Sequence, residues 1–226
     1  DPGQRPTAQD LLVRLAAIRT SITSQATEHA GTRTARIAGS TRARAEQPTS
    51  ATWRLTTPAT RPHTDGAPHD LTVTAPIKGR SVPLSEVADP TFSHGFFGPG
   101  MAIVPDSGPV VSPVDGEVLV AFPTGHAYGL RSASGVELLI HVGMDTVKLD
   151  GKGFTPHVKA GDKVRRGTPL VDVDWAAIKA AGYETVTPVV VSNATKFGGV
   201  SETSPTEVNL GDAFYSVAPA EAAAKV

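Results

Sequence analysis

The chain has 226 residues, a formal net charge of −1 and no cysteine, which excludes disulfide bridges and thiolate metal sites. Nineteen prolines and 22 glycines, with only 5% aromatic residues, favour an architecture of short strands and turns over a helical one. No apolar run approaches the roughly 18 residues of a membrane span, and no secretory signal pattern is present, so we expect a soluble cytoplasmic protein.

The first 66 residues differ in composition from the rest of the chain. Residues 1–66 hold nine arginines, no lysine and five acidic residues, a balance of +4, whereas residues 67–226 balance to −5. Large apolar side chains are scarce from Thr23 to Pro68, so this stretch cannot bury enough surface to fold. We expect residues 1–66 to be an N-terminal extension that is largely disordered.

A short amphipathic helix is expected near the start of this extension. A capping-box-like start at Thr7 is followed by one helical stripe of apolar residues, Leu11, Leu15, Ile18 and Ile22. Arg14 and Arg19 are expected to lie on the solvent-exposed face of this helix, so neither a nucleic-acid partner nor direct membrane insertion is predicted. The helix could also be a remnant of a fused transporter domain, and the sequence leaves that open.

From Leu71 onward, short apolar runs alternate with turn residues, a pattern typical of an all-β sandwich or barrel. One helix is expected over Trp175–Ala181, with Asp174 as its N-cap and Gly182 after its end. The expected strands are Leu71–Ile77, Gly100–Val104, Pro109–Ser112, Gly116–Phe122, Ala127–Leu130, Val136–Val142, Thr146–Leu149, Pro169–Val173 and Pro188–Val191.

Two histidines flank one predicted hairpin. His141 ends the apolar strand Val136–Val142, and His126 begins the preceding strand, with Thr124 two residues before it. If the hairpin loop is centred between Ala133 and Ser134, the histidines stand directly opposite, with Cβ atoms roughly 4.5–5.5 Å apart. A three-residue loop would instead send them to opposite faces. Paired imidazoles suggest metal binding, acid–base chemistry or phosphoryl transfer, whereas a lone buried histidine is usually a core residue.

Several separate blocks resemble one family, the glucose- and β-glucoside-type enzyme IIA domain of the bacterial sugar phosphotransferase system. They span about Leu71 to Val217, and they are SVPLSEVADPTF, VSPVDGEV, PTGHAYGLRS, GVELLIHVGMDTV and TVTPVVVSN. The resemblance implies an antiparallel β-sandwich or barrel of the duplicated hybrid motif type. It also implies a phosphoryl-carrier domain over residues 71–217, followed by a C-terminal tail over 218–226.

The resemblance further implies roles for individual residues. His141 would accept a phosphoryl group from a phosphocarrier protein and pass it to a cysteine of an enzyme IIB domain of a sugar permease. His126 would assist, with Thr124 hydrogen-bonded to it, and no cofactor or metal would be needed. The sugar itself stays unspecified, because the membrane component carries that specificity. Residues expected at the docking face are Asp89, Phe92, Phe122, Asp145, Val147 and Asp174.

Three alternatives compete with this interpretation. Lysostaphin-like zinc metallopeptidases also carry histidine pairs, but they require a His-x-His motif that this sequence lacks, and His157 lies in a turn. The run KAGDKVRRGTPL is similar to lipoyl and biotinyl carriers, but no modifiable lysine occupies a tight hairpin. A phosphorylation-dependent regulatory binding module remains open, since that role can coexist with a relay.

Overall fold

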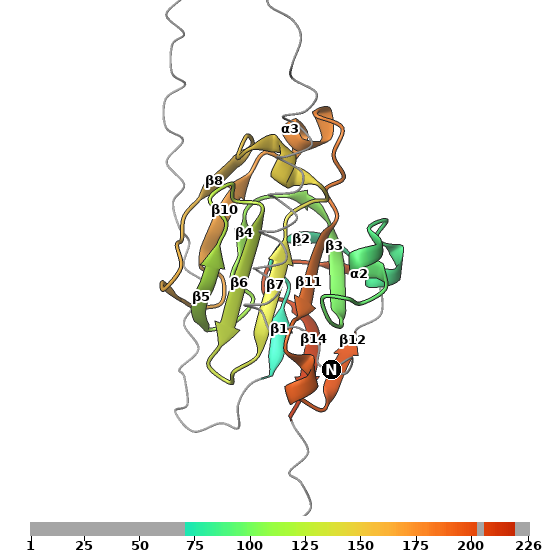
Figure 1. Cartoon of the computed structure of the whole chain (residues 1–226), viewed down its shortest axis with the longest axis vertical. Coiled ribbons are helices and arrows are strands. Elements are labelled where there is room, and N and C mark those ends of the chain that lie inside the picture. Colours follow the sequence, from blue (N-terminus) through green and yellow to red (C-terminus); the bar gives the residue numbers. More distant parts are fainter. Residues whose placement is uncertain (1–70, 203–205, 220–226) are drawn as a thin grey trace, which may run out of the picture. The chain divides into compact units, whose positions relative to one another are not determined.

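The computed structural model describes residues 71–202 and 206–219, and these form one β domain built from three antiparallel sheets (Figure 1). The expected N-terminal helix, linker and end of the tail lie outside the described residues. No helix in the described part of the chain is long and apolar enough to cross a membrane.

The largest sheet has eight strands in the order β13-β2-β3-β11-β7-β6-β5-β9. Within it, β7 lies between β6 and β11, and all three run side by side in Figure 1. The strands are β2 (Lys78–Pro83), β3 (Gly100–Ser107), β5 (Gly116–Ala121), β6 (Ala127–Ser132), β7 (Glu137–His141), β9 (Lys163–Val164), β11 (Thr187–Val191) and β13 (Glu207–Val208).

Two three-stranded sheets and a few short helices complete the domain. One sheet has the order β1-β14-β12, from β1 (Thr72–Thr74), β14 (Ala213–Ala218) and β12 (Gly199–Glu202). The other has the order β4-β10-β8, from β4 (Val110–Val111), β10 (Pro169–Val173) and β8 (Phe154–Pro156). The helices are α2 (Pro90–Ser93), α3 (Trp175–Ala180) and the 3₁₀ turns η1 (Leu84–Glu86), η2 (Thr146–Leu149) and η3 (Ala194–Lys196).

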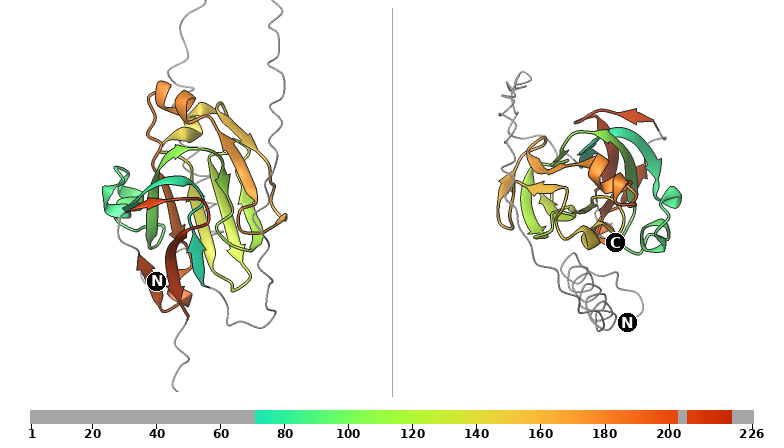
Figure 2. Two further views of the ribbon diagram at one scale, coloured as in Figure 1. Left: turned by 180° about the vertical axis from the view of Figure 1, so that it is seen from behind. Right: turned by 90° about the horizontal axis from the view of Figure 1, so that it is seen from above.

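A single apolar core joins the three sheets. Its buried members come from every sheet, including Val73 of β1, Ile103 of β3, Ile140 of β7 and Leu170 of β10. Seen from above, the strands lie around this interior (Figure 2). Each fully buried aliphatic side chain contributes about 1.5–3 kcal/mol relative to exposure. All residues of β7 are buried, so the core fixes the position of this strand and of the histidine at its end.

The fold class predicted from the sequence is confirmed, and the helix at Trp175 is present with Asp174 accepting a hydrogen bond from the Ala177 amide. The strand predicted over Thr146–Leu149 is wrong, because this segment is the 3₁₀ turn η2. Left-handed backbone at Asp145 and Asp150, with φ of 59° and 50°, bends the chain at both ends of the segment. That tertiary geometry overrides the strand preference of threonine and valine.

Several elements carried too weak a sequence signal to be predicted. These are β2, with glycine, charge and proline in KGRSVP, the short β8, β9, β12 and β13, the helix α2, and β14. Strand β14 lacks a strict alternation of buried and exposed residues. Its buried residues are Phe214, Tyr215 and Val217, and the first two of these are adjacent. Short strands of this kind are defined by their partners rather than by their own composition.

Candidate functional site

His141 is the last residue of β7 and lies in the interior of the large sheet. Its side chain is buried, with 8% of its surface exposed. Its Nδ1 lies 2.7 Å from the carbonyl oxygen of Gly143, and since a carbonyl only accepts, Nδ1 carries the proton. In the neutral ring, Nε2 is then the unprotonated nitrogen, which is the atom available for chemistry.

His126 lies just before the first residue of β6. Its side chain is 4% exposed, and its Nδ1 is 2.6 Å from the hydroxyl oxygen of Thr124. The main chain ties it to the same hairpin, because the Val142 amide donates to the His126 carbonyl at 2.7 Å. Thr124, which the sequence analysis paired with His126, is thus in contact with it.

The two imidazole rings are neighbours, with centroids 5.3 Å apart and planes at 71°. The register predicted for them is nevertheless wrong, because His141 pairs with Ala127, one residue away from His126. Ser132 and Val136 close a three-residue loop through the Ser132 amide and the Val136 carbonyl. A regular strand with this register would place the rings on opposite faces.

Gly125 explains why the rings meet in spite of that register. This residue has a φ of 70°, and His126 precedes the regular strand, so strand alternation does not fix the direction of its side chain. A Cβ atom at Gly125 would lie 2.9 Å from the Cβ of Phe154 and 3.1 Å from Cγ of Pro156. Only glycine therefore suits this position. The sequence signal for this arrangement is the glycine directly before the histidine.

Phenylalanine rings form the apolar walls of the pair. Phe92 of α2 packs on His141 with centroids 5.5 Å apart, and Phe122 packs on His126 at 5.0 Å. Phe97 in turn contacts Phe92 at 5.0 Å and is buried, whereas the neighbouring Phe96 is 65% exposed. Phe92 and Phe122 therefore line the histidine pair, whereas Phe97 is buried behind Phe92 and Phe96 lies on the surface. The sequence alone could not specify this division.

Two carboxylates act on His141 through space. Burial lowers the pKa of His141 from its ordinary 6.5, while the Gly143 carbonyl, Asp89 and Asp145 oppose that shift. Asp89 also caps α2 by accepting from the Thr91 amide at 2.7 Å. Asp145 is exposed and forms an ion pair with Lys148 at 3.0 Å. Desolvation is the largest of these effects, so the ring is neutral at pH 7.

The remaining predicted docking residues have local structural roles. Asp174 is exposed and caps α3, and Val147 is half-buried in η2, where its carbonyl accepts from the Asp150 amide. Among the residues that the structure describes, no three His, Cys, Asp or Glu side chains lie together in a group that could hold a metal ion.

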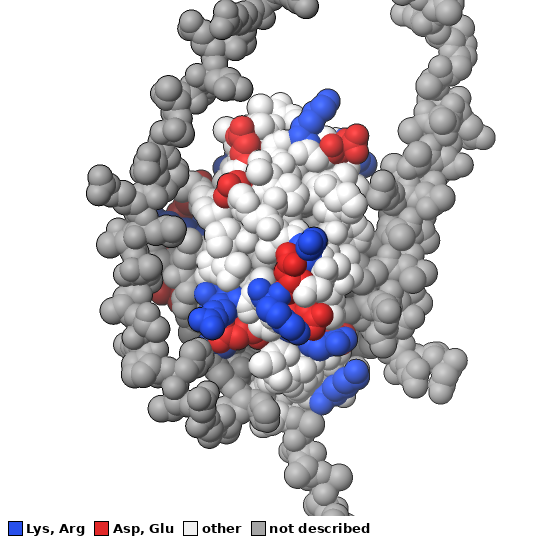
Figure 3. Space-filling view, turned by 90° about the vertical axis from the view of Figure 1, so that its left-hand side faces the viewer, with Lys and Arg blue, Asp and Glu red and all other residues white. Residues whose placement is uncertain are grey.

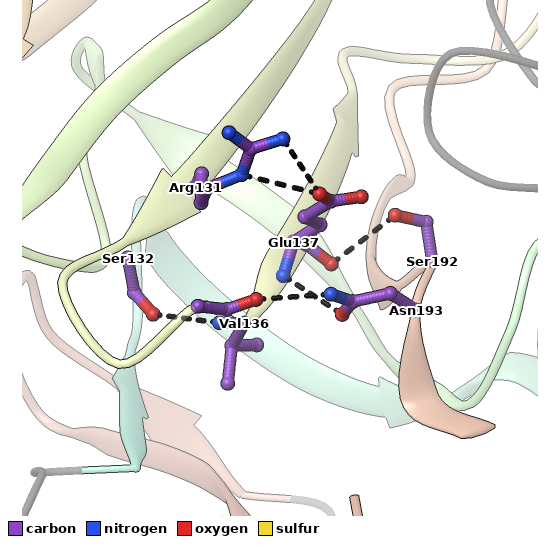
Figure 4. A network of polar contacts seen from close by, with 7 residues as sticks. Arg131, Ser132, Val136, Glu137, Ser192 and Asn193 are labelled. Atoms are coloured by element: carbon purple, nitrogen blue, oxygen red, sulfur yellow. Dashed lines mark hydrogen bonds and ion pairs between the residues drawn. The ribbon is translucent and has the colours of Figure 1, made fainter. Parts of the chain in front are cut away.

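The opposite end of β7 carries a different polar cluster (Figure 4). Arg131 binds the buried carboxylate of Glu137 through Nε at 3.1 Å and Nη2 at 2.9 Å. Asn193 accepts from the Glu137 amide and donates to the Gly135 carbonyl, both at 2.9 Å. Ser192 donates its amide proton to the Glu137 carbonyl at 2.9 Å. This network fixes the hairpin loop against the segment after β11.

One face of the domain shows how its surface charges are distributed. Figure 3 shows basic side chains gathered in the lower part of the view, with acidic side chains among them. Exposed pairs of this kind include Lys163 with Glu117 at 2.8 Å. Interspersed charges of opposite sign largely cancel one another at a distance.

The fold and the site define a small β domain with a buried, aromatic-walled pair of histidines. Comparison with known proteins agrees with this description, since the profile of the family described as phosphoenolpyruvate-dependent sugar phosphotransferase system, EIIA 1, matches residues 71–197. The chain belongs to this family, which confirms the resemblance found in the sequence.

Individual relatives show the same relationship. The chain is 44% identical over 145 residues to a glucose-specific EIIA component from Oceanobacillus iheyensis, covering 64% of this chain and 88% of that protein. It is 48% identical over 144 residues to a β-glucoside-specific EIIBCA component from Dickeya chrysanthemi, covering 64% of this chain but 23% of that protein. The chain thus spans about a quarter of that larger relative.

A solved structure agrees as well. Glucose permease IIA from Mycoplasma capricolum superposes with a TM-score of 0.60 and 36% sequence identity, covering 65% of this chain and 94% of that chain. The β domain is therefore the part of the chain that shares its fold with this protein.

Proposed function

We propose that the β domain relays phosphoryl groups in a sugar phosphotransferase system, accepting them on His141 and passing them to a cysteine of an enzyme IIB domain. The observation that carries this proposal is the hydrogen bond from Nδ1 of His141 to the Gly143 carbonyl, which leaves Nε2 as the nucleophile. The family assignment supports the same role, because relatives include sugar-specific EIIA and EIIBCA components.

The electrostatic setting of His141 suits a nucleophile. A nitrogen attacks phosphorus only when its lone pair is free, and burial lowers the pKa of His141, so the ring is neutral at pH 7 and Nε2 keeps its lone pair. The carbonyl of Gly143 pulls on the Nδ1 proton and thereby raises the basicity of Nε2. Burial and the carbonyl contact together give a neutral ring with an electron-rich Nε2.

In the proposed transfer, Nε2 of His141 forms a bond to phosphorus while the bond from phosphorus to the phosphocarrier breaks. In the second step, the enzyme IIB thiolate attacks the same phosphorus and Nε2 leaves with its lone pair restored. Such transfers have loose, in-line transition states, so the protein contributes mainly by positioning and by stabilising charge on the phosphoryl oxygens.

His126 is proposed to supply that stabilisation. If the Thr124 hydroxyl donates to Nδ1 of His126, the neutral ring carries its proton on Nε2 and can donate it to a phosphoryl oxygen. The ring separation of 5.3 Å leaves the two imidazoles close enough to share one phosphoryl group. Phe92 and Phe122 exclude water beside the rings, which would slow hydrolysis of the phosphohistidine.

Two partner proteins must reach the histidines in turn, and the surface near them offers suitable groups. We propose that the half-buried Phe122 forms the apolar centre of the docking face, with Val147 beside it, while Phe92, which has only 3% of its surface exposed, supports this face from within. The acids Asp89, Asp145 and Asp174 would steer a basic phosphocarrier, an attraction that weakens as salt is added. Phe96, with 65% of its surface exposed, offers a further apolar side chain for docking.

We propose, as the sequence predicts, that residues 71–217 are sufficient for phosphoryl acceptance and that residues 1–66 and 218–226 are extensions. Removing residues 1–66 should leave the thermal unfolding midpoint and the transfer rate nearly unchanged. A large loss of either quantity would show that the segment is part of the functional domain.

The direct test is phosphorylation of the purified chain. Incubation with phosphoenolpyruvate, enzyme I and phosphocarrier protein should place one acid-labile phosphate on His141, as located by mass spectrometry of peptides kept at alkaline pH. Adding an enzyme IIB domain should then discharge it. Stable incorporation elsewhere, or none at all with a partner set active on a known enzyme IIA, would contradict the proposal.

A further inference from the structure

The loop that follows His141 is held by a complete set of hydrogen bonds. Two peptide groups flank Gly143, one joining it to Val142 and the other to Met144. The Val142 carbonyl accepts from the Thr146 hydroxyl at 2.6 Å, and the Gly143 amide donates to the Thr187 hydroxyl oxygen at 3.3 Å. Each hydroxyl belongs to a side chain with no exposed surface.

The second peptide group completes the set. The Gly143 carbonyl accepts from Nδ1 of His141, and the Met144 amide donates to the Glu184 carbonyl at 2.9 Å. The Gly143 carbonyl and the Met144 N–H belong to the same peptide group. Because donation through the N–H makes the carbonyl a stronger acceptor, the contact with Glu184 strengthens the hydrogen bond from His141. All four polar groups around Gly143 are therefore paired.

Gly143 itself allows this arrangement. Its φ of 70° lies in the left-handed region, and a Cβ atom there would lie 2.7 Å from Cγ2 of Thr146 and 2.8 Å from the Glu184 oxygen. The loop is thus clamped between η2 on one side and the segment leading into β11 on the other. The Thr187 hydroxyl is oriented in turn, since it donates to the Thr185 carbonyl at 2.9 Å.

We propose that Thr146 and Thr187 are positioning residues for phosphoryl transfer, holding the Gly143 peptide groups so that His141 keeps its proton on Nδ1 and presents Nε2 to phosphorus. Neither threonine touches the reacting atoms, and both act through the loop. The inference rests on the proposed function for its kinetic consequence, while its effect on the His141 tautomer is independent of that function.

Isosteric variants separate the hydroxyl from the methyl groups. Thr146→Val and Thr187→Val remove one hydroxyl each, whereas Thr146→Ser and Thr187→Ser retain it. In the unphosphorylated protein, long-range ¹H–¹⁵N NMR correlations report which ring nitrogen of His141 is protonated. We expect the wild type and both serine variants to show the proton on Nδ1, and both valine variants to show a mixture of the two tautomers.

Kinetics provide the second measurement. Each valine variant should accept phosphate about tenfold more slowly, a factor that corresponds to weakening one hydrogen bond. The serine variants should retain most of the wild-type rate. Thr146 and Thr187 lie on different elements. If one of the two valine variants does not fold, the other still tests the proposal.

Thr74→Val is the matched control, since Thr74 is a buried residue whose hydroxyl donates to the Pro113 carbonyl at 3.0 Å, outside the loop around Gly143. It should lose stability and keep both the His141 tautomer and the rate. The proposal is overturned if the valine variants keep the wild-type tautomer, or if Thr74→Val slows acceptance equally. If the wild type takes no phosphate but the tautomers shift as expected, the proposed function fails while the positioning role stands.

Discussion

The two ends of β7 bury polar side chains in opposite ways. At the Glu137 end, a carboxylate and the main chain are paired with Arg131, Ser192 and Asn193 (Figure 4). At the His141 end, one ring nitrogen is tied to a carbonyl, while Nε2 has no hydrogen-bond partner among the described residues. One strand thus carries a saturated structural network and, four residues along, a ring nitrogen without such a partner.

The difference indicates how burial is used at each end. A buried polar group that is left unpaired costs about 1–3 kcal/mol, so the fully paired network at the Glu137 end stabilises the hairpin. Nε2 of His141 is not among the buried unpaired atoms of the described residues, so it keeps some contact with solvent. Removing a side chain at the Glu137 end should therefore change stability, whereas removing the His141 side chain should change phosphoryl transfer.

The largest expected effect is that of His141→Ala on phosphate acceptance. The variant lacks the atom proposed to carry the phosphoryl group, so incorporation should fall to background. His141→Gln, which fills more of the buried site, should behave identically in the assay while unfolding near the wild-type midpoint. Phosphate counted per chain by radiolabelling measures the outcome, and near-normal labelling of either variant would reassign the acceptor.

His126 should have a smaller effect on the same reaction. If it stabilises charge on the phosphoryl oxygens, His126→Ala should still be phosphorylated on His141, about 10²–10³-fold more slowly. His126→Gln should recover part of that rate, because its amide can donate from a similar place. Single-turnover transfer from phosphocarrier protein measures both rates, and an unchanged rate in His126→Ala would falsify the proposed role.

At the other end, Asn193→Ala should affect stability and leave chemistry alone. The Glu137 amide loses its acceptor, and the Gly135 carbonyl loses its donor. The free energy of unfolding should therefore fall by about 3 kcal/mol. Ser192→Ala is the matched control, because its hydroxyl contact with the Glu137 carbonyl is 3.3 Å long and should be worth far less. Urea unfolding compares the variants, and a slowed phosphoryl transfer in Asn193→Ala would show that the two ends are coupled.

The smallest effect concerns pH. Burial lowers the pKa of His141 in the folded protein below its ordinary 6.5, so the unfolded chain binds a proton more readily. This contribution to stability is complete above pH 6.5 and is lost progressively as pH falls below it. A tenfold difference between the acid constants corresponds to about 1.4 kcal/mol. The unfolding free energy of the wild type should therefore fall relative to that of His141→Gln as pH falls from 7 to 5, and parallel curves would contradict the buried, neutral ring.

The sequence by itself determined the family and the all-β class, and it singled out two histidines and Thr124, which the structure brings together. These were accessible because local patterns carry them: apolar runs between turn residues, and several sequence blocks in family order. The sequence also gave correct limits for most strands near the site, since Val136–Val142 and Ala127–Leu130 closely match β7 and β6.

Tertiary structure decided the geometry that makes these residues a site. The hairpin has a three-residue loop, so the predicted pairing of His126 with His141 failed by one residue, and the turn at Gly125 brought the rings together instead. Loop length depends on contacts such as those of Asn193 with Gly135 and Glu137, which join positions far apart in the chain. The proposed control of the His141 tautomer likewise depends on the loop around Gly143, which Thr146 and Thr187 hold from η2 and β11. Such long-range contacts form only when the chain is folded, and for that reason no local pattern in the sequence records them.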